Sequence, residues 1–125
     1  MTRKIKSIQW PCKIDQIPPN APYFEDANLL IAADCAAFAY SAFHQDFIKN
    51  HVTVSVCGRS GDTDYYEKLV RIIKENNVKS VKVVIMDVGC CEGVANLAKR
   101  AIRESGKFVP WQIVKISTDG RFVDF

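Results

Sequence analysis

The sequence predicts a three-layer α/β/α domain around a mostly parallel sheet of about five strands. Segments rich in apolar and β-branched residues alternate along the chain with segments that repeat apolar residues at helical spacing. The connections between the predicted strands are long enough for the helical crossovers that parallel pairing requires. The 125 residues, of which 48% are hydrophobic, suffice for one core of good size. We therefore expect residues 1–125 to form a single α/β domain.

Strand patterns differ according to the expected burial of each strand. Residues 29–33 are apolar at every position, which is typical of a strand covered on both faces. Residues 51–56 are rich in β-branched side chains. Residues 7–14 alternate but contain Pro11, which cannot donate to a ladder, so this strand is expected at a sheet edge. The remaining predicted strands are 78–88, 111–117 and a short edge strand within 118–125.

Helical spacing marks three connecting segments. Residues 35–50 are predicted as one helix, and residues 65–77 as a second. After Cys91, apolar residues repeat at the spacing of a buried helix face, and Gly106 lies where a C-terminal cap is expected. The members of this apolar face are Val94, Leu97, Ala98, Ala101 and Ile102. Strands and helices in this alternation predict a Rossmann-like arrangement with right-handed crossovers.

Composition excludes several classes of protein. The formal net charge is +3, and no basic run or interleaved aromatic stripe indicates binding to nucleic acid or to an anionic membrane. The basic N-terminal stretch lacks the apolar segment of about 7–15 residues that a signal peptide needs. No apolar run approaches the roughly 20 residues that span a bilayer. A cytoplasmic location is expected, where thiols stay reduced, so five cysteines favour metal or redox chemistry.

Four cysteines lie near the ends of predicted strands. Cys35 directly follows one strand, Cys57 ends the next, and Cys90 and Cys91 follow a third. In a parallel sheet all carboxyl ends lie at one edge, which is where open α/β sheets bind ligands. We therefore expect these four thiols to share one site. Cys12 differs, because it falls within a predicted strand on an apolar face and is expected to be a plain core thiol.

The chemistry of such a site points to a metal. Each of the four cysteines lies at the start of a helix or of a loop leading to one, where unpaired amides stabilise thiolates. Thiolate-rich sites favour iron–sulfur clusters or zinc. No C-x-x-C spacing occurs, so the local zinc-knuckle and two-cluster ferredoxin patterns are missing. The residues alone leave a cluster, zinc and an empty dithiol site open.

Three stretches carry a more specific resemblance: QWPCKIDQIPPNAPYFEDANLLIAADCAAFAYSAFHQDF, VCGRSGDTDYYEKL and VKVVIMDVGCCEG. Together they resemble the C-terminal half of ferredoxin-type 4Fe-4S binding proteins of anaerobic bacteria and archaea. The family combines an A-A-D-C segment, an F-H-x-D-F motif and a double-cysteine turn. The resemblance implies a 4Fe-4S cluster held by Cys35, Cys57, Cys90 and Cys91.

The same resemblance implies supporting residues around the ligands. Asp34 belongs to the A-A-D-C segment and His44 to the F-H-x-D-F motif, so both are expected beside the site. Gly89 and Gly93 flank the tandem cysteines and are expected to give the backbone its freedom there. The chain departs from the family in having no N-terminal two-cluster ferredoxin domain, in CGRSGD after the second strand, in CCEG, and in Cys12.

These observations predict a redox carrier or accessory domain rather than a stand-alone enzyme. Its expected role is electron transfer, or support of a redox complex in an anaerobe, with a separate ferredoxin or other redox protein as partner. One alternative is a zinc-binding or metal-free structural and interaction module. A further alternative is a dithiol redox site or sensor. Neither G-x-S-x-G nor G-x-G-x-x-G occurs, so a hydrolase or nucleotide-dependent dehydrogenase is not proposed.

Overall fold

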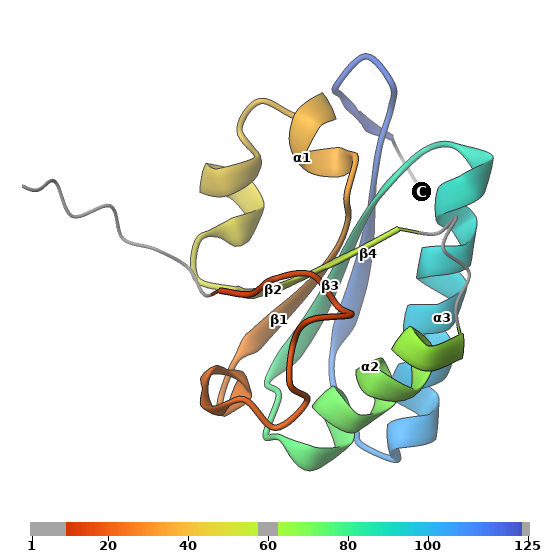
Figure 1. Ribbon diagram of the computed structural model, residues 1–125. Coiled ribbons are helices and arrows are strands. Elements are labelled where there is room, and N and C mark those ends of the chain that lie inside the picture. The colour runs from red at the N-terminus through yellow and green to blue at the C-terminus, as the bar shows by residue number, and fades with distance from the viewer. Residues whose placement is uncertain (1–9, 58–62, 124–125) are drawn as a thin grey trace, which may run out of the picture.

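The computed structural model describes residues 10–57 and 63–123, apart from the side chains of Thr63, Asp64 and Cys90. In chain order the elements are η1 (Pro22–Phe24), β1 (Asn28–Ala33), α1 (Ala36–Ala39), η2 (His44–Ile48), β2 (Val52–Val56), α2 (Thr63–Glu75), β3 (Ser80–Met86), α3 (Gly89–Ser105), β4 (Trp111–Ile116) and β5 (Phe122–Val123) (Figure 1). The predicted inner strands are confirmed, with differences of one or two residues at their ends.

The sheet has five strands in the order β2-β1-β3-β4-β5. β1 pairs in parallel with β2 and β3, β3 pairs in parallel with β4, and β5 runs antiparallel to β4. The prediction of a mostly parallel sheet is therefore confirmed. The order is that of a doubly wound sheet, because the chain first moves from β1 to one side and then returns to build the other.

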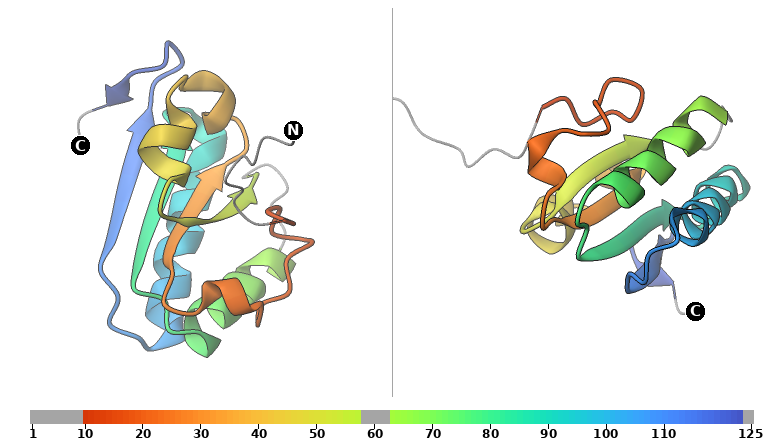
Figure 2. Two further views of the ribbon diagram at one scale, coloured as in Figure 1. Left: turned by 90° about the vertical axis from the view of Figure 1, so that its left-hand side faces the viewer. Right: turned by 90° about the horizontal axis from the view of Figure 1, so that it is seen from below.

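Helices cover both faces of this sheet. In the left view of Figure 2, α1 and η2 lie in front of the sheet and α3 lies behind it, where α2 packs against α3. The central strand β1 is covered on both sides, and Leu29, Leu30 and Ile31 are all 0% exposed. This double cover explains why residues 29–33 are apolar at every position. The three-layer architecture is confirmed.

The helix predicted over residues 35–50 is wrong, because the structure breaks it after Ala39. Tyr40 is extended, with φ −113° and ψ 112°, and the chain resumes as the π-helix η2. The ring of Tyr40 packs between Phe47 and Phe122, at 5.5 and 5.1 Å between centroids. The turn before β5 also closes on α1, since a Cβ on Gly120 would lie 2.8 Å from the carbonyl oxygen of Ala39. Tertiary packing has therefore overridden local helical spacing.

The long helix α3 follows its predicted pattern. Val94, Ala98, Ala101 and Ile102 are buried, and Leu97 is half-buried. Gly106 ends the helix with φ +74°, the left-handed conformation that a C-terminal glycine cap requires. Within the described ranges, no helix combines the length and apolarity needed to span a membrane.

The predicted edge strand before β1 is present only in part. Residues 7–9 lie outside the described ranges, and Lys13 forms a single parallel bridge with Ser55 at the outer side of β2. Two backbone hydrogen bonds hold this bridge, from Ser55 N to Cys12 O at 2.8 Å and from Ile14 N to Ser55 O at 3.0 Å. The edge position that Pro11 predicts is therefore confirmed.

Candidate functional site

The carboxyl ends of β1 and β3 form the topological switch point of the sheet. From β1 the chain crosses to β2 through α1 and η2 on one face, and from β3 it crosses to β4 through α3 on the other. Connections that leave neighbouring strands toward opposite faces open a crevice, where doubly wound folds bind ligands. Cys35 follows β1 at this point, and Cys90 and Cys91 lie in the first turn of α3 after β3. We call this side of the sheet the carboxyl edge.

The cysteines at the carboxyl edge differ in exposure. Cys35 is exposed and Cys57, next to the end of β2, is half-buried. Cys91 is only 4% exposed and belongs to the hydrophobic core, on the buried face of α3. The side chain of Cys90 lies outside the described part of the chain. Cys12, predicted to be a core thiol, is half-buried instead, since it lies on the outer segment beside β2.

The residue types at this edge fit an iron–sulfur cluster, because they are thiols. The positions of the described side chains fit it less well. Cys35 and Cys57 follow adjacent strands, and neither is buried. Among the described side chains, however, no group of three or more His, Cys, Asp or Glu is placed to hold a metal ion. The structure thus brings the cysteine-bearing strand ends together without gathering their described thiols into a ligand set. A cluster held by all four cysteines stays a prediction.

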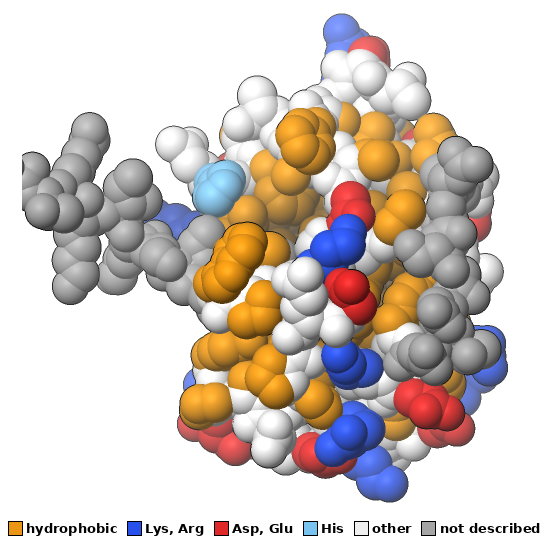
Figure 3. Space-filling view, viewed as in Figure 1, with side chains coloured by type: hydrophobic (Ala, Val, Ile, Leu, Met, Phe, Trp, Pro, Cys, Tyr) orange, Lys and Arg blue, Asp and Glu red, His pale blue; other side chains and the backbone are white. Residues whose placement is uncertain are grey.

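Asp34 joins three segments at the carboxyl edge. Its amide donates to Val56 O at 2.8 Å, and its carboxylate accepts from the hydroxyl of Ser55 and from Lys13 Nζ, the latter at 2.9 Å. The hydrogen bond and the charge of Asp34 raise the pKa of Lys13. Asp34 therefore fastens the outer segment to β1 and β2 beside Cys57. Figure 3 shows acidic and basic side chains next to each other on this face rather than in a patch of one sign.

Tyr65 is a residue that the sequence did not reveal as part of this edge. It is 6% exposed, and within the described part of the protein its buried hydroxyl has no hydrogen-bond partner. Burial raises the pKa of Tyr65, and the charge of the Cys57 thiolate raises it further. The same thiolate charge contributes to the raised pKa of Lys13. Cys57 thus interacts electrostatically with Lys13 and with Tyr65.

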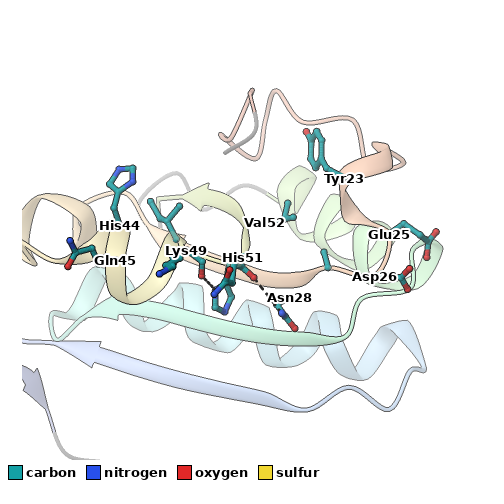
Figure 4. Close-up of a pocket in the computed structure, with 12 residues that line it drawn as sticks. Tyr23, Glu25, Asp26, Asn28, His44, Gln45, Lys49, His51 and Val52 are labelled. Carbon is teal, nitrogen blue, oxygen red and sulfur yellow. Dashed lines mark hydrogen bonds between the residues drawn. The ribbon is translucent and has the colours of Figure 1, made fainter. Parts of the chain in front are cut away.

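His44 lies in a different environment from the described thiols. It is exposed on η2 and lines a cavity of about 690 Å³ at the amino ends of β1 and β2, together with Tyr23, Asn28 and His51 (Figure 4). None of the described cysteines lines this cavity. Both histidines of the chain therefore belong to the amino edge of the sheet.

The conformational role predicted for Gly89 and Gly93 is wrong. Neither has a positive φ, and a Cβ on either would meet no atom within 4 Å. The two glycines instead leave open space beside the start of α3. Val88, the N-cap residue of that helix, provides no side-chain hydrogen bond to its first amides. Most of the CGRSGD stretch between β2 and α2, residues 58–62, lies outside the described ranges.

The fold and the switch-point site define a doubly wound α/β domain. A family model for the Rossmann-like domain matches residues 21–124, and the chain belongs to this family. The chain is also 29% identical over 99 residues to an uncharacterized protein of Archaeoglobus fulgidus, and the alignment covers 79% of this chain and 70% of that relative. No solved structure matches the chain significantly. These comparisons establish the family but show no link to ferredoxin-type proteins.

Proposed function

We propose that this protein is a redox module that holds an iron–sulfur cluster at the carboxyl edge. The observation that supports this most is the adjacency of β2, β1 and β3, the three strands whose ends carry Cys57, Cys35 and the tandem cysteines. Neighbouring strands lie about 4.8 Å apart, so the ends of β2, β1 and β3 lie within about 10 Å of one another across the sheet. Such spacing suits a ligand set drawn from separate connections.

The residues assigned to the cluster come from three elements. Cys35 supplies a thiolate after β1, Cys57 after β2, and Cys90 and Cys91 from the first turn of α3. When bound, the cluster would supply one-electron chemistry. The positive end of the α3 dipole favours thiolates there. The positive charge of Lys13 would do the same for Cys57.

A separate ferredoxin or other redox protein would exchange electrons with this edge. Phe38 lies one helical turn after Cys35 and is 93% exposed, which offers an apolar contact for a partner next to an exposed thiol. The cluster-bearing role therefore needs no pocket for a small substrate at the carboxyl edge.

The deciding experiment is anaerobic reconstitution followed by quantification of iron, sulfide and zinc. Bound iron and sulfide with broad absorption near roughly 400 nm, typical of thiolate–iron clusters, are the expected result. Cys35→Ala and Cys57→Ala should each abolish that absorption. Cys12→Ala is the matched control and should retain it. Persistence of the spectrum in Cys35→Ala and Cys57→Ala would contradict the ligand assignment, and stoichiometric zinc without iron would favour a structural zinc module.

One observation favours a second candidate, a redox-active dithiol. Ala33 and Val56 are register partners, and Cys35 and Cys57 follow them by two residues and one residue. Oxidation of this pair would form one S–S bond and release two protons, with two electrons passing to a disulfide of a partner protein. Thiol counting before and after chemical reduction tests it. A gain of two thiols on reduction, lost in Cys35→Ala, would support the dithiol.

A further inference from the structure

An ion pair joins the outer segment to the end of β1, between two of the proposed ligands. Lys13 Nζ lies 2.9 Å from a carboxylate oxygen of Asp34, and Asp34 directly precedes Cys35. Lys13 also forms a parallel bridge with Ser55, two residues before Cys57, and Figure 1 shows this segment, in red, beside β2. One positive and one negative side chain therefore lie at the ends of the two strands that Cys35 and Cys57 follow.

Further hydrogen bonds hold both members of the ion pair in place. Asp34 N donates to Val56 O at 2.8 Å, and the Ser55 hydroxyl donates to the carboxylate oxygen of Asp34 that does not face Lys13. On the other side, two amide–carbonyl hydrogen bonds between the outer segment and Ser55 hold the backbone of Lys13 against β2. The carboxylate therefore has two partners, and the lysine extends from a backbone that is fixed to the sheet.

The charge of Lys13 acts on the thiolate of Cys57 as well as on Asp34. The hydrogen bond and the charge of Asp34 raise the pKa of Lys13 most, and the charges of Asp15 and of the Cys57 thiolate raise it further. Lys13 is therefore protonated at neutral pH. The side chains of Lys13 and Asp34 are 51% and 28% exposed, so solvent weakens their fields at the strand ends without removing them.

We propose that Lys13 raises and Asp34 lowers the reduction potential of the cluster at the carboxyl edge, an inference that rests on the proposed function. Each electron received from a redox partner adds one negative charge at this edge, and no bond forms or breaks. A nearby cation stabilises the added charge and favours the reduced state, whereas a nearby carboxylate favours the oxidised state. The two effects oppose each other in the wild-type protein, because both charges lie at the ends of β1 and β2.

Neutral substitutions on each side of the ion pair test this inference. The full chain is reconstituted anaerobically, and the visible absorption of the cluster is followed during redox titrations of wild type, Lys13→Gln and Asp34→Asn. Lys13→Gln should shift the equilibrium about fivefold toward the oxidised form, and Asp34→Asn about fivefold toward the reduced form. The double variant should return close to wild type, because both charges are then removed together.

Amide hydrogen exchange of the cluster-free protein separates the effect of charge from a loosening of the outer segment. Either single substitution removes the ion pair, so exchange at Ser55 N, which donates to Cys12 O at 2.8 Å, should become faster in both variants. A potential that followed this loosening would shift with the same sign in both variants. The charges themselves act with opposite signs, so the two causes give different results.

The matched controls are Arg71→Gln and Glu75→Gln, which break an ion pair of 2.8 Å in the second half of α2 and change the net charge by the same amounts. They should leave the potential unchanged. With a cluster bound, shifts of the same sign in Lys13→Gln and Asp34→Asn, or no shift in either, would overturn this inference and leave the proposed function standing. A wild-type protein that binds no iron and sulfide would overturn the proposed function and, with it, this inference.

Discussion

At the amino edge of the sheet, the loop before β1 and the turn before β3 are bonded directly to each other. Asp26 N donates to Asn77 O at 3.0 Å, and Lys79 N donates to Ala27 O at 2.7 Å. The side chain of Asn76 reaches Pro19 O at 2.8 Å. These bonds join loops to loops and fix the starts of the two central strands.

At the carboxyl edge some described polar side chains are bonded and others have no described partner. Lys13, Asp34 and Ser55 bond to one another there. The Tyr65 hydroxyl has no described partner, and the start of α3 has no side-chain cap. This edge therefore keeps donors that a ligand could use.

The difference shows that a cavity and a functional edge need not coincide. The lining of the cavity at the amino edge contains polar side chains, but its two acids are already engaged. Asn77 N donates to Glu25 at 2.9 Å, and Asn77 Nδ2 donates to Asp26 at 2.7 Å. Figure 4 shows these acids at one end of the cavity and His44 at the other, so the polar groups do not converge on one point. We interpret the amino edge as structural and the carboxyl edge as the ligand site.

The largest expected effect tests whether the two edges carry different shares of stability. Phe24, at the amino edge, is 0% exposed, and Phe38, at the carboxyl edge, is 93% exposed. Phe24→Ala should cost about 3–5 kcal/mol of unfolding free energy, because it leaves a cavity in the core. Phe38→Ala should change it by less than about 0.5 kcal/mol. Urea unfolding measures both, and equal losses would contradict this division.

A smaller effect tests the loop bonds at the amino edge. The Nδ2 of Asn76, which is 7% exposed, donates to Pro19 O and Ile72 O, both at 2.8 Å. Asn76→Ala should cost about 2 kcal/mol, because it leaves buried carbonyls without a donor. Asn77→Ala removes one exposed bond to Asp26 and should cost about 0.5 kcal/mol. A larger loss for Asn77→Ala in thermal or urea unfolding would show that the exposed bonds hold the loops.

Much of the fold could be predicted because the pattern of apolar residues in each element reflects which of its faces are buried. Residues 29–33 lack polar side chains since helices cover both faces of β1, and α3 shows one apolar face since the other meets solvent. Those patterns place Cys35 and Cys57 after their strands. Adjacency of the strand ends then follows from parallel pairing.

The rest depends on contacts between distant segments, which periodicity does not encode. The break after Ala39 results from packing of Tyr40 against Phe122, a residue of another element. Asp34 meets Ser55 across 21 positions of sequence. Tyr65 has the pattern of an ordinary inward residue of α2, and only the fold shows that its hydroxyl lacks a partner.

The smallest expected effect concerns Tyr65 at alkaline pH. Burial first, and the Cys57 thiolate second, raise the pKa of Tyr65 above its ordinary value of 10.0. The folded state therefore holds the phenolic proton more tightly than the unfolded state. This contribution to stability is complete below pH 10.0 and is lost as the pH rises through the folded pKa. Tyr65→Phe should leave stability near neutral pH intact and reduce the alkaline loss.

Urea unfolding of wild type and Tyr65→Phe at a series of pH values from neutral to strongly alkaline measures this difference. Other groups with raised pKa, such as Lys13 and Tyr23, add an alkaline loss of the same sign to both proteins, so the comparison isolates Tyr65. Cys57→Ala should reduce the loss by a smaller amount, because it removes only the second cause. Parallel curves for wild type and Tyr65→Phe would contradict a raised pKa of the Tyr65 hydroxyl in the folded state.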